Sequence, residues 1–268
     1  MESGRRRVMG VVNVTPDSFS DGGRFLDRET AIAHGRALVA QGADWIDVGG
    51  ESTRPRADPV PVDEELRRVI PVVEALASAG VAVSIDTRKA AVAEAAVAAG
   101  ARMINDVSAS LAAVAGATGA AFVAMHMLGD PRTMQADPAY GEVVTEVRDF
   151  LVDRADAARA AGVHEVWIDP GIGFGKTLDH NLDLLANLDV LVATGYPVLV
   201  ATSRKTTLGA LAARADRTQI VPPAGDRLEG SIATAAWSLL RGARMVRVHE
   251  VPATMRALDA CGRVLAAA

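Results

Sequence analysis

Five segments of this chain repeat one arrangement, in which a short apolar run leads into a polar or charged residue. These polar residues are Asp86, Asn105, Asp169, Lys205 and His249. A buried parallel strand reads as a near-continuous apolar run, and the side chains at its carboxyl end face the open end of the sheet. Residues that end neighbouring strands can therefore converge on one ligand. The arrangement predicts an active site at one end of a parallel sheet.

Apolar runs alternate with alanine-rich stretches of helical period along the chain, as expected of a parallel sheet with crossover helices. Eight strands are predicted, at residues 8–12, 45–48, 81–86, 103–105, 121–125, 166–169, 197–201 and 245–248. Helices are predicted at residues 30–41, 63–79, 90–99, 111–118, 142–161, 179–193, 206–214, 228–241 and 252–265.

The connections that precede the predicted strands are short, and several of those that follow the strands are long. Several predicted helices stop at a glycine just before the next strand, whereas residues 13–27, 49–61 and 126–140 form long loops after strands. We therefore predict a (β/α)8 TIM barrel, formed by a single domain over residues 1–268, with its chemistry on the loops that follow the strands. A doubly wound open sheet is the alternative, but no Gly-x-Gly-x-x-Gly motif opens a first helix.

Composition excludes several classes of partner. The formal net charge of -5 argues against nucleic-acid binding, which requires clustered Lys and Arg. No segment approaches the roughly 18 apolar residues of a membrane span, so we expect no membrane partner. Cys261 is the single cysteine and cannot form an internal disulfide, which favours a reducing cytoplasm.

Two carboxylates and a carboxamide end the third, fourth and sixth predicted strands, at Asp86, Asn105 and Asp169. Carboxylates accept paired N–H groups, and an amide offers both a donor and an acceptor. A flat heterocycle with amino and amide nitrogens, such as a purine or a pterin, would use all three. Any one of these residues alone is explained equally well as a cap of the following helix. The three together favour a binding site.

Positively charged and hydroxyl-bearing residues follow the last two strands. The helix start at Lys205 and Thr206 offers unpaired amides, an ammonium and a hydroxyl, which suit a carboxylate. Arg247 and His249 lie two residues apart and are expected to face the same side as a second anion site. A structural salt bridge is the alternative for Arg247. After Asp169, glycines let the backbone approach a planar ligand, with Phe174 as a wall or stacking face.

Eight short motifs occur in order along the chain: Asn-x-Thr-Pro-Asp-Ser-Phe, Gly-Gly-Glu-Ser-Thr-Arg-Pro, Ser-Ile-Asp-Thr, Ile-Asn-Asp-Val, Met-His-Met-x-Gly-x-Pro-x-x-Met-Gln, Asp-Pro-Gly-Ile-Gly-Phe-Gly-Lys, Ser-Arg-Lys and Arg-Val-His. With these motifs the chain resembles the dihydropteroate synthases, folate-pathway enzymes of the pterin-binding barrel family. The resemblance extends from about Val8 to the C-terminus. Each motif alone is weak evidence, but eight in register are specific.

The resemblance implies a transferase that joins 6-hydroxymethyl-7,8-dihydropterin diphosphate to p-aminobenzoate and requires Mg2+. It also implies a homodimer that acts on small-molecule substrates. The residues that it implies for the pterin are Asp86, Asn105, Asp169 and Lys205, together with Met125 and Phe174. Those for the diphosphate are Asn13, Arg247 and His249, with the metal near Asn13 and Asp17. Those for p-aminobenzoate are Phe19, Thr53, Arg54, Pro55 and Thr206.

The resemblance assigns catalysis to Asp17, Arg54, Asp86 and Lys205. Diphosphate would leave first, giving a cationic pterin methylene that carboxylates such as Asp86 stabilise. The amine of p-aminobenzoate would then add, without a covalent enzyme intermediate.

Three residues depart from the usual family motifs: Arg56 replaces Gly, Thr207 replaces a bulky apolar residue, and Glu250 replaces Asp. We expect altered affinity for p-aminobenzoate and for the sulfonamides that mimic it. Two alternatives share the pterin-binding barrel. One is a methyltetrahydrofolate methyltransferase, and the other is a pterin-binding paralogue with weak or lost activity.

Overall fold

The computed structural model describes residues 6–14, 24–52, 58–131 and 133–267, apart from the side chains of residues 24–27 and 267. Its strands are β1 (Arg7–Asn13), β2 (Trp45–Gly49), β3 (Val83–Asp86), β4 (Met103–Asp106), β5 (Ala121–Met125), β6 (Val166–Asp169), β7 (Leu199–Val200) and β8 (Met245–Val248). Its helices are α1 (Arg24–Ala40), α2 (Val62–Ser78), α3 (Ala90–Ala98), α4 (Ala112–Thr118), α5 (Val143–Ala160), α6 (Leu178–Ala186), α7 (Leu188–Val192), α8 (Thr206–Ala215), α9 (Leu228–Leu240) and α10 (Val251–Ala267).

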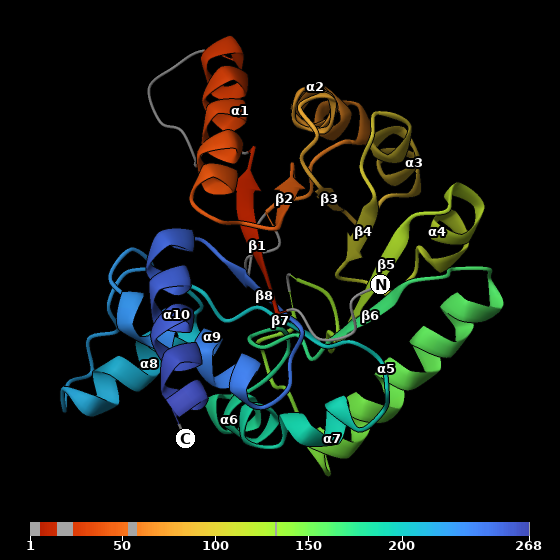
Figure 1. Cartoon of the computed structure of the whole chain (residues 1–268). Helices are drawn as coiled ribbons and strands as arrows, with labels where there is room; N and C mark the ends of the chain where they lie inside the picture. The colour runs from red at the N-terminus through yellow and green to blue at the C-terminus, as the bar shows by residue number, and fades with distance from the viewer. Residues whose placement is uncertain (1–5, 15–23, 53–57, 132, 268) are drawn as a thin grey trace.

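The strands form one parallel sheet that curls into a barrel. Their order is β6-β5-β4-β3-β2-β1-β8-β7, and a parallel bridge between Ile168 and Val198 joins the two outer strands. The helices surround the strands, as Figure 1 shows. The predicted (β/α)8 barrel is therefore confirmed, and the doubly wound alternative is wrong. Within the described ranges, no helix is long and apolar enough to cross a bilayer.

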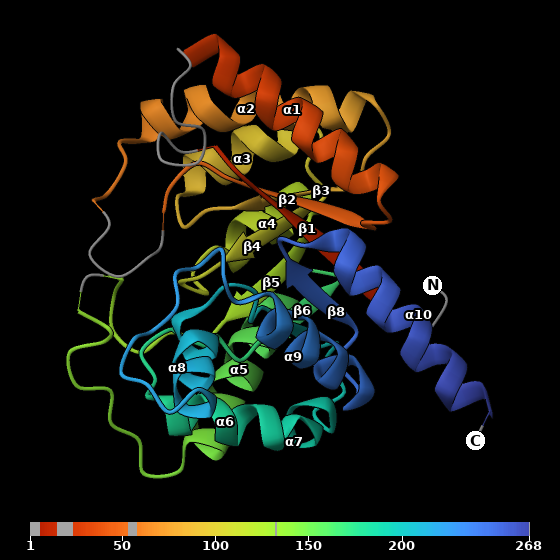
Figure 2. The ribbon, with the colours of Figure 1, turned by 90° about the vertical axis from the view of Figure 1, so that its left-hand side faces the viewer.

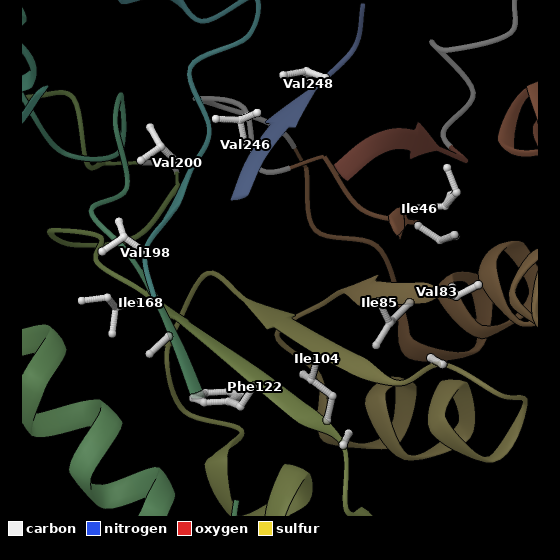
Figure 3. Packing of buried hydrophobic residues seen from close by; sticks show 14 of the residues in the cluster. Ile46, Val83, Ile85, Ile104, Phe122, Ile168, Val198, Val200, Val246 and Val248 are labelled. Carbon is white, nitrogen blue, oxygen red and sulfur yellow. The ribbon is translucent and has the colours of Figure 1, made fainter. Parts of the chain in front are cut away.

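Alternate residues of each strand point outward and pack beneath the helices. Figure 3 shows part of this layer, including Ile46, Ile85, Ile104, Phe122 and Ile168, each of which is fully buried. Successive side chains of a strand point to opposite faces, so the neighbours of these residues point into the barrel. Burying each such side chain contributes about 1.5–3 kcal/mol, which makes this layer the main source of stability.

The inward-facing residues divide into an apolar part and a polar part. Met9, Met103, Trp167, Leu199 and Met245 belong to a separate apolar cluster inside the barrel. Two positions further along their strands lie polar residues: Asn105 after Met103, Asp169 after Trp167 and Arg247 after Met245. The two-residue period of the strands thus places polar groups above an apolar floor, at the carboxyl end of the barrel.

The long loop after β5 also lies at this carboxyl end. Figure 2 shows it in green, on the side of the barrel opposite to the end of α10.

Most elements agree with the predicted bounds to within one or two residues at each end, and three differences have a physical explanation. The helix expected at residues 179–193 is two helices, because Asn187 has non-helical φ and ψ of -109° and 34° and its side chain donates to the Asp183 carbonyl. Helix α1 also includes residues 24–29, where Arg and Leu favour a helix. Strand β7 covers only Leu199–Val200 of the predicted residues 197–201. Pro197 lies outside it because it lacks an N–H and can only accept a hydrogen bond there, from Ile168.

Candidate active site

The sheet register brings the predicted strand-end residues to one rim. Gly49 pairs with both Asn13 and Asp86, and Asp86 pairs with Asn105. On the neighbouring strands Met125 pairs with Asp169. Because parallel pairing sets these residues abreast, their side chains surround the same opening of the barrel.

Arg247 lies at the centre of the polar residues on this rim. Its Nη2 donates to Asp86 Oδ2 at 2.8 Å, and its Nε donates to Asp47 Oδ2 at 2.6 Å. The same Asp47 oxygen accepts a hydrogen bond from Asn105 Nδ2 at 3.0 Å. These contacts occupy two of the five N–H donors of the guanidinium. Arg247 is thus ion-paired, as the structural alternative proposed, while its side chain keeps 17% exposure at the rim.

The two carboxylates of the predicted ring site lie in an environment that opposes charge. Burial raises the pKa of Asp86 to about 7, with Arg247 opposing this rise and Asp47 adding to it. Burial also raises the pKa of Asp169, although the Lys205 ammonium and a hydrogen bond from the Gly171 N–H oppose it. A ligand that brings N–H donors or positive charge would stabilise the ionised form of these carboxylates.

Lys205 lies in the loop after β7, and its side chain contacts the loop after β6. Its Nζ donates to the Ile172 carbonyl and lies 4.5 Å from the centre of the Phe174 ring. Burial lowers the pKa of Lys205 to about 8, and the Asp169 carboxylate opposes this change. Lys205, Phe174 and Asp169 therefore belong to one group of side chains.

A buried lysine with no role predicted from the sequence, Lys176, links the loop after β5 to the loop after β6. The Lys176 ammonium contacts His126 Nδ1 at 2.9 Å and donates to the carbonyls of Phe174 and Gly171 at 3.0 and 3.1 Å. Burial lowers the pKa of Lys176 to about 7 and that of His126 to about 3. The two loops also touch directly, because a Cβ on Gly171 would lie 1.9 Å from the His126 carbonyl oxygen.

A hydroxyl and two charged side chains support His249, which follows β8. The Ser203 hydroxyl contacts His249 Nδ1 at 2.9 Å and donates to Glu250 Oε2 at 3.1 Å. Arg204 forms an ion pair with Glu250. The Glu250 departure thus lies in a hydrogen-bonded cluster beside His249.

Two threonines begin α8. Thr206 is its first residue and is exposed, as a carboxylate site at the helix start requires, whereas Thr207 is buried. The amides of the first turn of a helix lack intrahelical partners, and a hydroxyl beside them adds a further donor.

The start of the second loop is held by buried ion pairs that sequence reasoning also missed. Glu51, whose side chain is only 7% exposed, pairs with Lys89 and Arg88, and Lys89 also pairs with the fully buried Glu65. The Val60 N–H donates to Glu51 across the loop. The charged residues of this network come from one helix and two loops that are separated in the sequence. No sequence pattern therefore indicated that they pair.

Several predicted site residues cannot be placed. Asp17, Phe19, Thr53, Arg54, Pro55 and the departure Arg56 lie outside the described residues.

Asn13 is the predicted magnesium ligand that the structure describes. It ends β1 and is half-buried, and its Oδ1 lies near Gly49, where a Cβ would approach both Asn13 Oδ1 and Asp86 Oδ2. Across the described residues, no group of three or more His, Cys, Asp or Glu side chains could hold a metal. Mg2+ is commonly held by one or two protein oxygens together with substrate phosphates and water, so a single amide oxygen beside the predicted diphosphate site fits this ion.

Comparisons with known proteins agree on one family. The profile described as "Pterin binding enzyme" matches residues 9–249. The dihydropteroate synthase of Mycobacterium leprae is 48% identical over 265 residues, covering 96% of this chain and 92% of that protein. The Escherichia coli K12 dihydropteroate synthase is 42% identical over 267 residues, covering 97% and 92%.

Solved structures give the same result. Xanthomonas albilineans dihydropteroate synthase with 4-aminobenzoic acid has a TM-score of 0.90 and 47% identity, covering 98% of this chain and 94% of that one. The same enzyme in complex with 7,8-dihydropteroate has a TM-score of 0.87 and 44% identity, covering 99% and 96%. The chain therefore belongs to the pterin-binding enzyme family and, within it, to the dihydropteroate synthases.

Proposed function

We propose that this chain condenses 6-hydroxymethyl-7,8-dihydropterin diphosphate with p-aminobenzoate, giving 7,8-dihydropteroate and pyrophosphate. The observation that carries the proposal is the meeting of Asp86, Asn105 and Asp169 with Arg247 and Lys205 at one rim. This set offers hydrogen-bond acceptors for the amino and N–H groups of a pterin and cations for its anionic leaving group.

The pterin ring would bind edge-on to the acceptors. Asp169 engages the Gly171 N–H through Oδ1, which leaves Oδ2 for the ring. Asp86 and Asn105 would accept further N–H groups, and Lys205 would donate to the ring carbonyl. Phe174, beside Lys205, and Met125, at the end of β5, would form the apolar walls.

The diphosphate would lie over Asn13, Arg247 and His249. Arg247 retains N–H donors beyond its two carboxylate contacts, and His249 is oriented by Ser203. Mg2+, held by Asn13 and Asp17, would supply charge neutralisation for the departing diphosphate.

The bond between the pterin methylene carbon and the diphosphate oxygen would break first, with its electron pair leaving on the diphosphate. The ionised Asp86 carboxylate, close to the ring, would stabilise the cation that remains. The amine of p-aminobenzoate would then form the C–N bond and lose a proton. Arg54 would assist this step, as the family resemblance implies.

The p-aminobenzoate carboxylate would bind at the start of α8, where Thr206 is exposed. Phe19, Thr53 and Pro55 would surround its ring. The Yersinia pestis dihydropteroate synthase, 40% identical, has been solved with a sulfonamide drug, so we also propose that sulfonamides inhibit this chain.

We further propose a homodimer in the cytoplasm. Trp237 and Leu240 on α9 and Val264 and Leu265 on α10 are each at least 45% exposed, and the two helices pack together. Exposed apolar side chains on two packed helices suit contact with a second copy of the chain. The single cysteine suits a reducing compartment.

A pyrophosphate-release assay with both substrates and Mg2+ tests the proposed function. Release that requires p-aminobenzoate supports it. Pterin binding without release would instead indicate the paralogue with lost activity, and methyl transfer to a corrinoid protein would indicate the methyltransferase. Complementation of a folate auxotroph gives an independent check.

Two variants separate the proposed roles. Asp86→Ala is expected to abolish pterin binding. Arg54→Ala is expected to impair turnover while pterin binding survives, and the reverse pattern would contradict the division of roles.

A further inference from the structure

Asp47, on β2, is a fully buried carboxylate with no role in the function described above. Its register partner on β3 is Ser84, which lies two residues before Asp86 and faces the same side of its strand. Asp47 therefore lies one step deeper in the barrel than the rim residues. From there it contacts two of them through a single oxygen.

The first contact determines the orientation of the Asn105 amide. Asn105 Nδ2 donates to Asp47 Oδ2 at 3.0 Å. An ionised carboxylate only accepts hydrogen bonds, so a flipped amide would set its own oxygen against the carboxylate oxygen. The contact therefore holds the Asn105 carbonyl away from Asp47. As a result, Asn105 presents an acceptor at a fixed position on the rim.

The second contact determines the orientation of the Arg247 guanidinium. Asp47 accepts from Nε at 2.6 Å while Asp86 accepts from Nη2 at 2.8 Å. These two donors share one edge of the planar guanidinium, so its other N–H groups point elsewhere. The guanidinium is therefore hydrogen-bonded along that edge, while the Arg247 side chain as a whole remains 17% exposed.

Stability alone does not explain Asp47. Its second oxygen, Oδ1, is buried without a hydrogen-bond partner among the described residues, and so is the hydroxyl of neighbouring Ser84. A buried polar atom without a partner costs free energy of folding. An apolar residue at this position would avoid that cost but would leave Arg247 and Asn105 without their shared acceptor.

We propose that Asp47 is a positioning residue that selects the heterocycle, by holding the Asn105 carbonyl and the Arg247 guanidinium in one geometry. The favoured ligand is a ring with an amino or N–H donor opposite Asn105, such as a 2-amino pterin. Rings that carry an acceptor there are rejected. The inference rests on the proposed function, because it assumes that the pterin lies at this rim.

Asp47→Asn tests the proposal, because asparagine has nearly the same shape but can turn either a donor or an acceptor towards Asn105. Calorimetry would compare 6-hydroxymethyl-7,8-dihydropterin diphosphate with its 2-oxo analogue, in which a carbonyl replaces the 2-amino group. We expect Asp47→Asn to weaken binding of the pterin at least about tenfold. The ratio of the Kd of the 2-oxo analogue to the Kd of the pterin should also be smaller in the variant than in the wild type. The KM for the pterin substrate should rise, whereas the KM for p-aminobenzoate should stay unchanged.

Ser84→Ala is the matched control, since Ser84 is the buried register partner of Asp47 but its hydroxyl makes no hydrogen bond to Asn105 or Arg247. It should preserve both affinity and preference. Equal losses in the two variants would show a general packing effect and overturn the proposal. If Asp47→Asn does not fold, Asp47→Ser removes the charge with less bulk and carries the same expectation.

A double-mutant cycle tests the route of the effect. Combined with Asn105→Ala, Asp47→Asn should cause little further loss of preference between the two rings, and additive losses would contradict the mechanism. Failure of the proposed function would be seen as absence of pyrophosphate release by the wild-type chain. This inference would fail if the wild-type chain releases pyrophosphate and Asp47→Asn has the same pterin affinity and the same preference between the two rings as the wild type.

Discussion

Lys176→Met replaces the ammonium that joins two active-site loops with an apolar side chain of similar length. In the structure Lys176 is only 3% exposed and contacts one ring nitrogen and three backbone carbonyls, those of His126, Gly171 and Phe174, over 2.9–3.3 Å. Methionine can donate to none of these acceptors. The loops therefore lose their shared donor while their buried backbone stays in place.

The expected loss of stability follows from the number of acceptors. Each buried group left without a partner costs about 1–3 kcal/mol. Two of the three carbonyls, those of His126 and Phe174, are affected in this way, because the Gly171 carbonyl still accepts from the Phe174 N–H. Part of this loss of folding free energy is offset, because methionine, unlike the lysine ammonium, carries no charge that must be desolvated on folding. We expect a net destabilisation of about 2–4 kcal/mol. A chain of this size would then melt roughly 5–15 °C lower.

The pH dependence of the melting temperature gives a second test. The pKa of Lys176 is lowered from 10.5 to about 7 by folding, so the unfolded chain binds more protons between these values. Stability from this group therefore rises as pH increases from about 7 towards 10.5. The difference in melting temperature between wild type and Lys176→Met should widen over this range.

Calorimetry with the pterin substrate shows whether the loops also position the site. We expect binding to weaken about tenfold, since Phe174 and the Ile172 carbonyl that receives Lys205 both lie in the loosened segment. Lys176→Gln, which keeps an N–H donor, should lie between wild type and Lys176→Met. An unchanged melting temperature together with unchanged pterin affinity would refute the reasoning.

Three further predictions address individual groups. Asp169→Asn should weaken pterin binding about 10- to 100-fold, because a charge-assisted hydrogen bond worth about 1.5–3 kcal/mol is lost, and calorimetry that finds equal affinity would contradict this role. The value of kcat/KM for the pterin substrate should fall as the pH drops below about 7, since protonated Asp86 cannot stabilise a cation, and Asp86→Asn should lack this acid limb. Gly171→Ala should unfold the protein or lower its melting temperature far more than Gly195→Ala. Both glycines have positive φ, 63° and 83°, but a Cβ at Gly171 meets the His126 carbonyl oxygen, whereas Gly195 has no atom within 4 Å. Similar thermal shifts for the two glycine variants would rule out the clash.

The barrel and much of its rim were predictable because they depend on local patterns. Apolar runs that end in Asp86, Asn105 and Asp169 report parallel strands, and parallel strands end side by side. Helix ends were less predictable. At Asn187 a single side-chain hydrogen bond divides one expected helix into α6 and α7, and apolar periodicity is insensitive to such a bond.

Residues that act through distant partners were missed. Asp47 is a charge within an apolar strand, a pattern that signals a buried partner without identifying it. That partner, Arg247, lies 200 residues away. Lys176 was visible only as the end of a glycine-rich motif, and its role depends on how two loops pack. Long-range pairing of this kind arises only in the folded barrel, so the local patterns of a single sequence do not reveal it.

The crystal structure of this chain with 6-hydroxymethyl-7,8-dihydropterin diphosphate is the most direct test of how the rim recognises its substrate. We predict that the edge of the ring hydrogen-bonds to Asp86, Asn105 and Asp169 while the diphosphate contacts Arg247 and His249. A ring bound away from these side chains, or a diphosphate held by other residues, would contradict the account.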